Sequence, residues 1–459
     1  MAKIRAWIKK VEVQAHFLYN KRKAFHEGRL IKGVFMQIKL PYDKTFQETE
    51  IEDSRIQGIL TSHLEEYKPE DDQLTIVKKA MENPIGSKKL KELAVGKDKV
   101  VILISDHTRP VPSKYILPLM LEEIREANPD ADITLLVATG CHRNSSKEEL
   151  VFKLGEEIYN NEKIYIHDCD DEEMLVTLDE KLPSGGDIVV NKIAAEADLL
   201  VAEGFIEPHF FAGFSGGRKS VFPGCCSRKT IMYNHNSEFI DSKYARTGNL
   251  ENNPIHRDMI AAARALGLVY VVNVVINSEK KVIHAVAGDL ERAHEAGTDW
   301  LKDKAGVDKK LADIVLTSNG GYPLDQNIYQ TVKSMTAAEA SLKDGGVIVV
   351  SSKSGDGTGG DAFHNAFLEE PDVEKLYQKF LDTDKIDTIP DQWESQILCR
   401  ILLKAKAVIY VSDYDPKTLE DFHLIPVKTL DEAMEKANEL MGEDSTVTVI
   451  PDGIAVIVK

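Results

Sequence analysis

The sequence predicts an α/β fold made of two α/β domains, with mostly parallel sheets and an active-site cleft between the domains. Continuous runs of β-branched and aliphatic residues, such as VVILIS at 100–105, have the composition of strands buried on both faces of a parallel sheet. Helical patterns separate most of these runs, as in repeated βαβ units. The chain of 459 residues is also longer than one ordinary core requires, which favours two domains.

Changes in composition and pattern divide the chain into four segments. Residues 1–35 contain nine Lys or Arg against two Glu. We predict a basic leader or extension there, either dispensable ahead of a start at Met36 or an amphipathic arm that binds a partner. Residues 36–305 are expected to form an N-terminal α/β domain that carries the main site, and residues 306–445 a C-terminal α/β domain that closes the cleft. Residues 446–459 are expected to form a hairpin that returns to the first domain.

The predicted N-terminal domain opens with a strand at 36–41, where apolar residues alternate, followed by a polar connection. A helical period covers 74–95, and the strand at 100–105 follows it. A helix at 113–127 then leads to a strand at 133–138, so these elements form a βαβ unit. The further elements expected here are strands at 163–168, 187–191, 198–205, 268–276 and 280–288, a helix at 255–266 and a hinge helix at 290–306.

The predicted C-terminal domain repeats the same alternation. A strand, a polar loop with two glycines and a helix occupy 312–335, and a second strand covers 347–352. A glycine-rich loop at 354–361 and helical segments within 372–405 precede a strand at 407–412. This order indicates a second sheet of the same kind.

Composition excludes several classes of protein. The formal net charge of −18 argues against a nucleic-acid surface, which requires clustered Lys and Arg. No apolar run approaches the roughly 18 residues that span a bilayer, so we expect no membrane association. The five cysteines form neither a disulfide framework nor a CxxC zinc pattern, which suits a reducing cytoplasm.

Two polar loops follow neighbouring strands of the predicted N-terminal sheet. The first contains Asp106, Thr108 and Arg109, and the second contains His142. Ligands of open α/β sheets bind at the carboxyl ends of strands, and Arg forms paired hydrogen bonds with carboxylates or phosphates. The alternative is an ordinary turn that ends at Pro110, with a structural histidine in the second loop.

The stretch from residue 203 to 235 concentrates reactive side chains. His209, Lys219 and His235 lie within one connection, and its glycines are expected to leave room for a ligand. The sequence SGGRKS lacks the GxxxxGK[ST] spacing of a phosphate loop, so ATP chemistry is not indicated. Lys219 is a candidate covalent anchor or a solvated lysine, and His235 is a candidate metal ligand or a polar residue near a helix end.

Histidines that follow two strands of one sheet can exchange a proton from opposite sides of a substrate. His142 and His209 have this arrangement, which suggests a racemase or epimerase. In the second domain Gln330 and Lys333 lie on one helix face beside Tyr329, where they form either a carboxylate site or a solvated face. Trp393 is either a pocket wall or part of the core.

Several separated motifs then occur in the order of a known family. They are SDHTRP at 105–110, ATGCHR at 138–143, EPHFFAGFSGGRKSVFPG at 207–224, NHN at 234–236, YPLDQNIYQTVK at 322–333 and DQW at 391–393. With these motifs the chain resembles the nickel-dependent lactate racemases over all but the basic leader. The resemblance implies racemisation of D- and L-lactate by proton-coupled hydride transfer.

The resemblance also implies a cofactor and residue roles. The cofactor is a nickel pincer nucleotide, the pyridinium-3-thioamide-5-thiocarboxylate mononucleotide, which Lys219 would hold covalently and whose nickel His235 would ligate. Square-planar nickel with soft ligands is consistent with this set. His142 and His209 would alternate as acid and base. The other implied contacts are cofactor contacts at Asp106, His107, Thr108 and Arg109, and substrate contacts at Arg109, Tyr329, Gln330, Lys333 and Trp393.

Three alternatives differ from lactate racemisation in class or substrate. A racemase or epimerase of larger 2-hydroxy acids, such as aryl, malate-like or sugar acids, would keep the motifs and change pocket walls. A non-catalytic nickel-cofactor carrier would lack one of the reactive side chains, and none is missing. An NAD-dependent dehydrogenase would need a GxGxxG turn that this chain does not have. The expected partners are a small 2-hydroxy acid and the proteins that make the cofactor and insert nickel.

Overall fold

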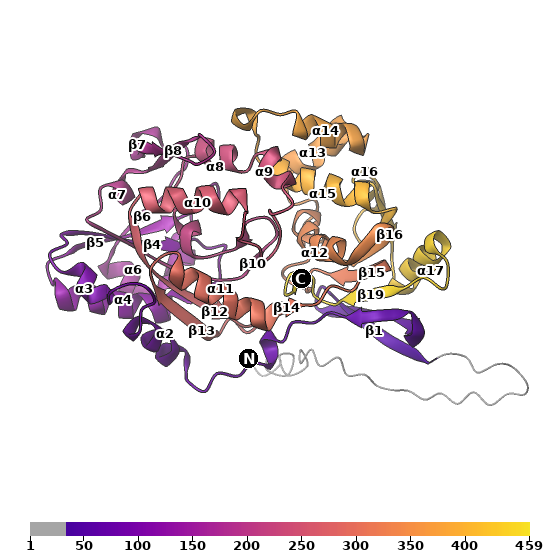
Figure 1. Ribbon diagram of the computed structural model, residues 1–459, viewed down its shortest axis with the longest axis horizontal. Helices are drawn as coiled ribbons and strands as arrows, with labels where there is room; N and C mark the ends of the chain where they lie inside the picture. The colour runs from indigo at the N-terminus through magenta and orange to yellow at the C-terminus, as the bar shows by residue number, and fades with distance from the viewer. Residues whose placement is uncertain (1–33) are drawn as a thin grey trace, which may run out of the picture. The chain divides into compact units, whose positions relative to one another are not determined.

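The computed structural model describes residues 34–459, so the predicted basic segment 1–35 lies almost wholly outside the described residues (Figure 1). The chain divides into two compact units. The N-terminal unit comprises residues 66–306 and 379–393. The C-terminal unit comprises the described residues up to 65 together with 307–378 and 394–459. Among the described helices none has the length and apolar content needed to cross a membrane.

A six-stranded sheet forms the centre of the N-terminal unit. Its order is β13-β12-β9-β4-β5-β6, and every neighbouring pair is parallel except β12 with β13. The strands are β4 (Lys99–Ser105), β5 (Asp132–Ala138), β6 (Lys163–Ile166), β9 (Leu199–Phe205), β12 (Leu268–Ile276) and β13 (Val282–Gly288). The aliphatic runs predicted as buried strands therefore form this sheet, because both of its faces are covered.

Helices cover both faces of this sheet. On one face α2 (Gln73–Glu82), α3 (Leu90–Ala94) and α4 (Ser113–Ala127) share a core with alternate residues of the strands. On the other, α10 (Pro254–Ala265) and α11 (Arg292–Ala305) contact β12. The predicted hinge helix is thus α11, and it packs on the sheet.

The strand order changes direction at β4. From β4 the chain continues to β5 and β6 on one side, while β9 and β12 lie on the other. In open α/β sheets such a switch point opens a crevice at the carboxyl ends of the strands. The loops that follow β4, β5 and β9 are therefore the expected location of a site.

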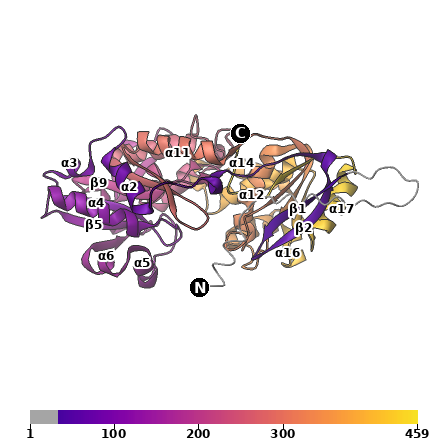
Figure 2. The same ribbon diagram turned by 90° about the horizontal axis from the view of Figure 1, so that it is seen from below.

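The C-terminal unit contains a second six-stranded sheet of order β18-β17-β16-β15-β19-β3, which is parallel throughout. Its strands are β3 (Ile56–Ile59), β15 (Ala312–Ser318), β16 (Leu342–Ser351), β17 (Ala407–Val411), β18 (Leu424–Val427) and β19 (Val447–Ile450). A hairpin of β1 (Phe35–Tyr42) and β2 (Thr45–Glu52) packs with α17 (Leu430–Met441) into a shared core (Figure 2). The helix α12 (Ile328–Ser341) packs on β15 and β16.

Shorter elements complete the two units. The helices are α5 (Lys147–Leu154), α6 (Glu156–Asn161), α7 (Lys192–Ala195), α8 (Arg228–Asn234), α9 (Ser237–Asp241), α13 (Asp361–Glu369), α14 (Val373–Leu381), α15 (Gln392–Lys404) and α16 (Pro416–Asp421). The single-turn 3₁₀ helices are η1 (Asp53–Arg55), η2 (Leu64–Glu66), η3 (Glu172–Met174), η4 (Gly217–Ser220) and η5 (Lys385–Asp387). The small strand pairs are β7 (Leu175–Lys181) with β8 (Asp187–Asn191), β10 (Pro208–His209) with β11 (Gly213–Phe214), and β14 (Gly306–Val307) with β20 (Ile457–Val458).

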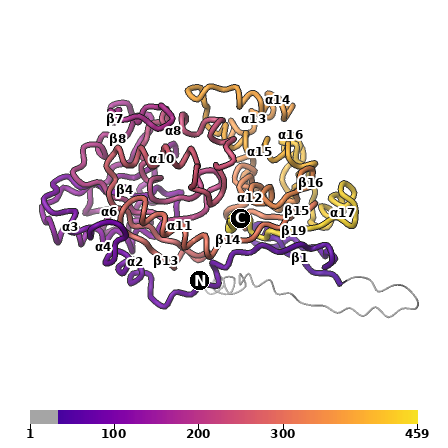
Figure 3. The backbone as a smooth tube through the Cα atoms, in the orientation of Figure 1, coloured from indigo at the N-terminus to yellow at the C-terminus, as the bar shows by residue number. Residues whose placement is uncertain are grey.

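The structure corrects two of the predicted boundaries. Residues 34–65 belong to the C-terminal unit rather than to a domain 36–305, because β3 pairs with β19 and β1 lies beside β15 (Figure 3). Residues 446–459 also belong to the C-terminal unit, and they are not a hairpin, because β19 joins the main sheet while β20 pairs with β14. Long-range pairing decided both points, and no local pattern carries that information.

Three smaller predictions also need correction. The helical period at 74–95 is interrupted between α2 and α3, where Pro84 and Gly86 stand. The polar connection before it contains β2 and β3. The strand at 187–191 exists as β8, but it pairs antiparallel with β7 outside the main sheet.

Candidate active site

An aspartate and a histidine meet at the carboxyl edge of the N-terminal sheet. Asp106 directly follows β4, and His142 lies in the turn after β5. The Nδ1 atom of His142 is 2.6 Å from Oδ2 of Asp106. The other carboxylate oxygen accepts hydrogen bonds from the backbone N–H of Thr108 at 3.0 Å and from its hydroxyl at 2.6 Å. The predicted convergence of the two loops is confirmed by these contacts.

The environment favours the ionised form of Asp106. Burial raises the pKa of the Asp106 carboxyl, but the hydrogen bond from His142, the charge of His142, the Thr108 hydroxyl and the Arg109 charge outweigh burial, and the pKa lies below its usual value. An ionised Asp106 accepts the proton on Nδ1 of His142. The other ring nitrogen, Nε2, then carries the lone pair that can act as a base. Asp106 is 1% exposed and the His142 side chain 46%, so the base can reach solvent or a substrate.

Two buried side chains that the sequence analysis did not identify, those of Glu203 and Lys153, hydrogen-bond to the loop that carries Asp106. Glu203 in β9 accepts hydrogen bonds from the backbone N–H of Ser105 at 3.2 Å and from the hydroxyl of Ser113 at 3.1 Å. Lys153 donates to the carbonyl of Arg109 at 3.0 Å. Together they hold both ends of the loop. A carboxylate within an otherwise apolar strand run, VAEGF, is the signal that identifies Glu203.

His107 makes its contacts at the start of α5. Its Nδ1 lies 3.0 Å from the hydroxyl of Ser145 and 3.8 Å from a carboxylate oxygen of Glu149, at the start of α5. Ser146 caps this helix with Glu149 in a reciprocal capping box. His107 therefore anchors the loop to α5, whereas Arg109 is close enough to lower the pKa of Asp106.

The glycines of the loop after β9 fit protein atoms rather than a ligand. A Cβ at Gly213 would lie 2.3 Å from the carbonyl oxygen of Asn249, and one at Gly217 would lie 2.8 Å from the ring of His294. Both residues have positive φ, at 80° and 53°. The expectation that these glycines leave room for a ligand was wrong, because neighbouring backbone and side chains fill the space.

Arg218 holds this loop and was missed at the sequence level. Its side chain is fully buried, and its guanidinium donates to the carbonyls of Ala212 at 2.7 Å and Phe214 at 2.8 Å. Burial lowers its pKa to about 9. Because five N–H donors in a fixed plane can bind several carbonyls at once, an arginine suits a loop that turns around its own side chain. The only sequence feature that points to Arg218 is its position as a second cation directly before Lys219.

Three residues predicted for the site surround the ring of Phe211, and a fourth packs against one of them. The Lys219 ammonium lies 6.0 Å from the ring centroid of Phe211, and the rings of His209 and His235 lie 4.5 and 5.2 Å from it. The Trp393 ring packs against His235 at 5.1 Å. We call these five residues the aromatic cluster. Within the N-terminal unit, His209, Lys219, His235 and Trp393 are therefore neighbours, as the candidate site requires.

His235 is a neutral imidazole with an available nitrogen. Burial first, and then the Lys219 charge, lowers its pKa to about 3. Its Nδ1 is buried and makes no hydrogen bond. Its backbone N–H donates to the carbonyl of Ile231 in the last turn of α8. A buried polar atom without a partner is costly, and neutral imidazole is a common ligand of transition metals. The residue therefore fits the metal-ligand role that the family resemblance implies.

The loops of the two groups are in direct contact. The backbone N–H of Gly140, two residues before His142, donates to the carbonyl of Gly224 at 3.0 Å. The N–H of Gly224 donates in turn to the carbonyl of Lys219 at 3.2 Å. The turn that carries His142 is thus tied by two hydrogen bonds to the loop that carries Lys219.

The remaining predicted residues begin α12 in the C-terminal unit. Asn327 caps this helix by accepting from the backbone N–H of Gln330 at 2.8 Å. The Lys333 ammonium donates to the side-chain carbonyl of Gln330 at 2.5 Å, and the Tyr329 ring packs against Phe363. The glycine-rich loop supports the helix start, since Gly357 and Thr358 accept backbone hydrogen bonds from its first residues. Gln330 and Lys333 are neighbours, as their spacing predicts.

The chain matches both domains of one protein family. Residues 42–248 match the family model described as Lactate racemase N-terminal domain. Residues 307–458 match the model described as Lactate racemase C-terminal domain. The chain is 50% identical over 422 residues to a lactate racemase of Thermoanaerobacterium thermosaccharolyticum, and 52% identical over 423 residues to one of Lactiplantibacillus plantarum. Each comparison covers 92% of this chain and 99% of the relative.

Solved structures agree with this assignment. The lactate racemase apoprotein of T. thermosaccharolyticum superposes with a TM-score of 0.88 at 51% identity, over 92% of this chain and 100% of that chain. A crystal structure of a Thermotoga maritima protein shares the fold, with a TM-score of 0.57 at 19% identity over 81% of this chain and 98% of that chain. With both family domains matched and half of the residues identical to lactate racemases, the chain belongs to the lactate racemase family.

Proposed function

We propose that the protein interconverts D- and L-lactate by proton-coupled hydride transfer, with His142 and His209 as the two acid/base residues. The racemase activity rests on the similarity to lactate racemases over most of the chain. The observation that carries the proton-transfer part is the 2.6 Å contact between His142 Nδ1 and Asp106 Oδ2. A carboxylate at this nitrogen fixes the ring orientation and leaves Nε2 as the base.

His142 accepts the hydroxyl proton of one enantiomer at Nε2. The C2–H of a 2-hydroxy acid is only weakly acidic, so removal of a hydride together with the hydroxyl proton is easier than removal of a C2 proton by histidine. The ionised Asp106 stabilises the imidazolium that forms. The same pair returns the proton when the reaction runs backwards, as microscopic reversibility requires.

His209 has a different hydrogen bond and serves the other enantiomer. Its Nδ1 accepts the backbone N–H of Ala212 at 3.3 Å, so the neutral ring carries its proton on Nε2. In this neutral form the Nε2–H can hydrogen-bond the substrate oxygen. Its ring is held between Phe210 and Phe211 at 5.1 and 4.5 Å. To protonate the substrate oxygen His209 must start as an imidazolium, in which Nδ1 also carries a proton and no longer accepts the Ala212 N–H. His142 starts as a neutral imidazole with the lone pair on Nε2, so the two histidines begin one proton apart and exchange these states in each turnover.

Two residues of the aromatic cluster fit the nickel pincer nucleotide. Lys219 offers the amine for covalent attachment, and His235 offers the neutral imidazole for nickel. When bound, this group supplies the hydride acceptor and donor for C2. Its synthesis and insertion depend on other proteins, which are the partners we propose. The Trp393 ring holds the imidazole of His235 in place.

The substrate carboxylate requires a cation. We assign it to Lys333, whose ammonium is oriented by Gln330, with Tyr329 as a wall and Arg109 as a second cation. A carboxylate bound at a fixed point lets the C2 substituents exchange faces while the molecule stays in the site. This is the requirement of a racemase that uses two acid/base residues.

The test is to replace each histidine in protein loaded by the cofactor-synthesis proteins. His142→Ala and His209→Ala are expected to lower racemisation in both directions by about 10²- to 10⁴-fold. The mass addition at Lys219 and the bound nickel should stay at wild-type levels. His364→Ala is the matched control, since that ring pairs with Asp421 in the C-terminal unit.

Retention of wild-type rates by either histidine variant would disprove the two-base assignment. A panel of aryl, malate-like and sugar 2-hydroxy acids tests the substrate separately. A larger acid that turns over with a kcat/KM above that of lactate would replace lactate as the substrate. Bound nickel without turnover of any acid would instead identify a cofactor carrier.

A further inference from the structure

Two cysteines of the N-terminal unit lie in contact beside the proposed acid/base residue. Cys141 precedes His142 in the turn after β5, and Cys169 lies in the loop after β6. Their Sγ atoms are 3.8 Å apart. The loops that carry them are tied together, because the Thr139 hydroxyl donates to the carbonyl of His167 at 2.5 Å. The pair is therefore held at van der Waals contact by the fold.

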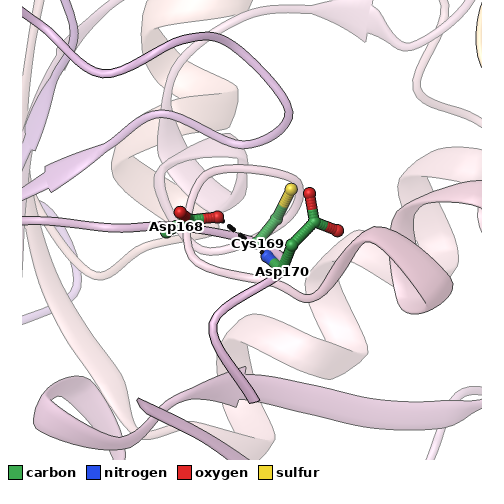
Figure 4. A group of neighbouring side chains, drawn as sticks. All are labelled: Asp168, Cys169 and Asp170. Atoms are coloured by element: carbon green, nitrogen blue, oxygen red, sulfur yellow. Dashed lines mark hydrogen bonds between the residues drawn. The ribbon is translucent and has the colours of Figure 1, made fainter. Parts of the chain in front are cut away.

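The residues flanking Cys169 do not form a cation site, although their ligand atoms lie within 4.8 Å of one another (Figure 4). Asp168 accepts the backbone N–H of Asp170 at 2.9 Å. Asp170 is paired with the guanidinium of Arg228 through contacts of 2.8 and 2.6 Å. A cation would have to displace this arginine. The reactive groups at this position are therefore the two thiols rather than the carboxylates.

We propose that Cys141 and Cys169 are a reversible disulfide site that lowers racemase activity when oxidised by a low-molecular-weight disulfide or a similar two-electron oxidant. The Cys141 thiolate attacks the oxidant disulfide, forms a mixed disulfide and releases one thiolate. Cys169 then attacks Sγ of Cys141 and expels the second thiolate. The protein loses two protons and two electrons, and the oxidant becomes two thiols.

Exposure assigns the first reaction to Cys141, although the hydrogen bond with Cys169 and burial raise the pKa of the Cys141 thiol and make its attack the slow step. Cys141 is partly exposed, whereas Cys169 is buried, so the oxidant meets Cys141 first. The hydrogen bond from the Cys141 thiol lowers the pKa of the Cys169 thiol, and the charge of Arg228 acts in the same direction. Once Cys141 has reacted, Arg228 still favours the thiolate of Cys169. Reaction within the pair is fast because the attacking thiolate and the mixed disulfide share one site.

Disulfide formation must move the turn that carries His142. An S–S bond is about 2.05 Å long, so the Sγ atoms have to approach by about 1.8 Å. Cys141 is joined directly to His142, whose ring contacts Asp106 at 2.6 Å. On the other side the carbonyl of Cys169 accepts the backbone N–H of Arg228, the first residue of α8, and His235 directly follows the end of this helix. Closure therefore displaces both the base and the helix of the metal ligand.

The other three cysteines provide contrast. Cys225 and Cys226 are buried and direct their Sγ atoms at the carbonyls of Ser220 and Val221, at 3.4 and 3.3 Å. Cys399 is buried in the C-terminal unit. Each is shielded from an oxidant, so oxidation should be selective for Cys141 and Cys169.

The experiment treats the folded, cofactor-loaded protein with glutathione disulfide, blocks free thiols in denaturant and maps unreduced peptides by mass. A peptide joining Cys141 to Cys169, lighter by two hydrogen atoms, is expected. Racemisation should fall about tenfold or more, since a displacement near 1 Å at a reacting group can cost ~10²-fold. Reduction with dithiothreitol should restore the rate. Cys399→Ala should behave like wild type. Cys169→Ser lacks the thiol that resolves the mixed disulfide, so it should retain glutathione on Cys141 and form no linked peptide.

Failure to find the linked peptide in oxidised wild-type protein, or glutathione retained on Cys141 in its place, would overturn the disulfide. A linked peptide with an unchanged rate would overturn the effect on activity. Peptide mapping on wild type needs no variant, so a poorly folding Cys169→Ser protein leaves that test intact. The activity arm rests on the proposed function, whereas the mapping arm does not, and the two therefore fail separately.

Discussion

Replacing Asp106 by Asn tests the base assignment more sharply than removing His142. The carboxylate oxygen Oδ1 accepts two hydrogen bonds from Thr108, and Oδ2 faces His142 Nδ1. In Asp106→Asn the amide oxygen is expected to keep the two donors of Thr108. The amide NH₂ must then face Nδ1 of His142 and donate to it. His142 is forced into the tautomer with its proton on Nε2, and the lone pair needed for the hydroxyl proton is lost.

The size of the effect follows from two contributions. Loss of a hydrogen bond to a charged group costs about 1.5–3 kcal/mol, which corresponds to roughly 10- to 150-fold in rate. The wrong tautomer adds to this, since the equivalent change in a serine protease triad costs on the order of 10⁴-fold in kcat. We therefore expect kcat/KM to fall by about 10²- to 10⁴-fold, with the hydrogen bonds of the Thr108 turn preserved.

The assay compares single turnovers from each enantiomer. Because D- and L-lactate have equal free energy, kcat/KM must fall by the same factor in both directions, so steady-state rates cannot assign a histidine to an enantiomer. Rapid quenching, with measurement of the keto acid formed per site, can assign each histidine to an enantiomer. We expect Asp106→Asn to slow the formation of keto acid from one enantiomer only. Rates are normalised to the modified fraction of Lys219.

Asp187→Asn is the control for this substitution. It removes an exposed carboxylate that pairs with Lys181, and solvent screening leaves such surface pairs with little effect on stability. If Asp106→Asn stayed within about twofold of wild type, or slowed both enantiomers equally in the first turnover, the orienting role of the carboxylate would be refuted.

Two further predictions concern the buried His235 and the half-buried His256. His235→Ala should lose bound nickel, measured by elemental analysis, while the mass addition at Lys219 persists; wild-type nickel content in this variant would exclude His235 as the ligand. Protein stability should fall as the pH drops below about 6.5, because the unfolded chain binds a proton at His256 whose folded pKa burial lowers to about 3. A histidine that is neutral in the folded protein lowers the unfolding free energy by about 1.4 kcal/mol for each pH unit of acidification in that window. Urea unfolding of His256→Gln should therefore give an unfolding free energy that depends less on pH between pH 6.5 and 5. An unchanged dependence on pH would show that His256 is protonated in the folded state.

Local sequence determined the strands and the loops that carry the chemistry. Continuous aliphatic runs such as β4, β5 and β9 have no polar face, so they can only be buried on both sides, and the polar loops after them must lie at one edge. For this reason Asp106, His142 and His209 were identifiable before their contacts were known. The motifs also identified the family, because several unrelated segments matched in order.

Tertiary structure alone decided which segments pair and which atoms meet. The early strand β3 joins a sheet formed some 250 residues later along the chain, and the last strands separate into two sheets. Glu203 acquired its role from the hydroxyl of Ser113, 90 residues away, and Arg218 acquired its role from carbonyls four and six residues back that only the folded loop brings to its side chain. The contact of Cys141 with Cys169 likewise depends on two loops being side by side. Local sequence fixes what each segment can bury, whereas pairing over long separations is settled only when all the segments compete for the same core.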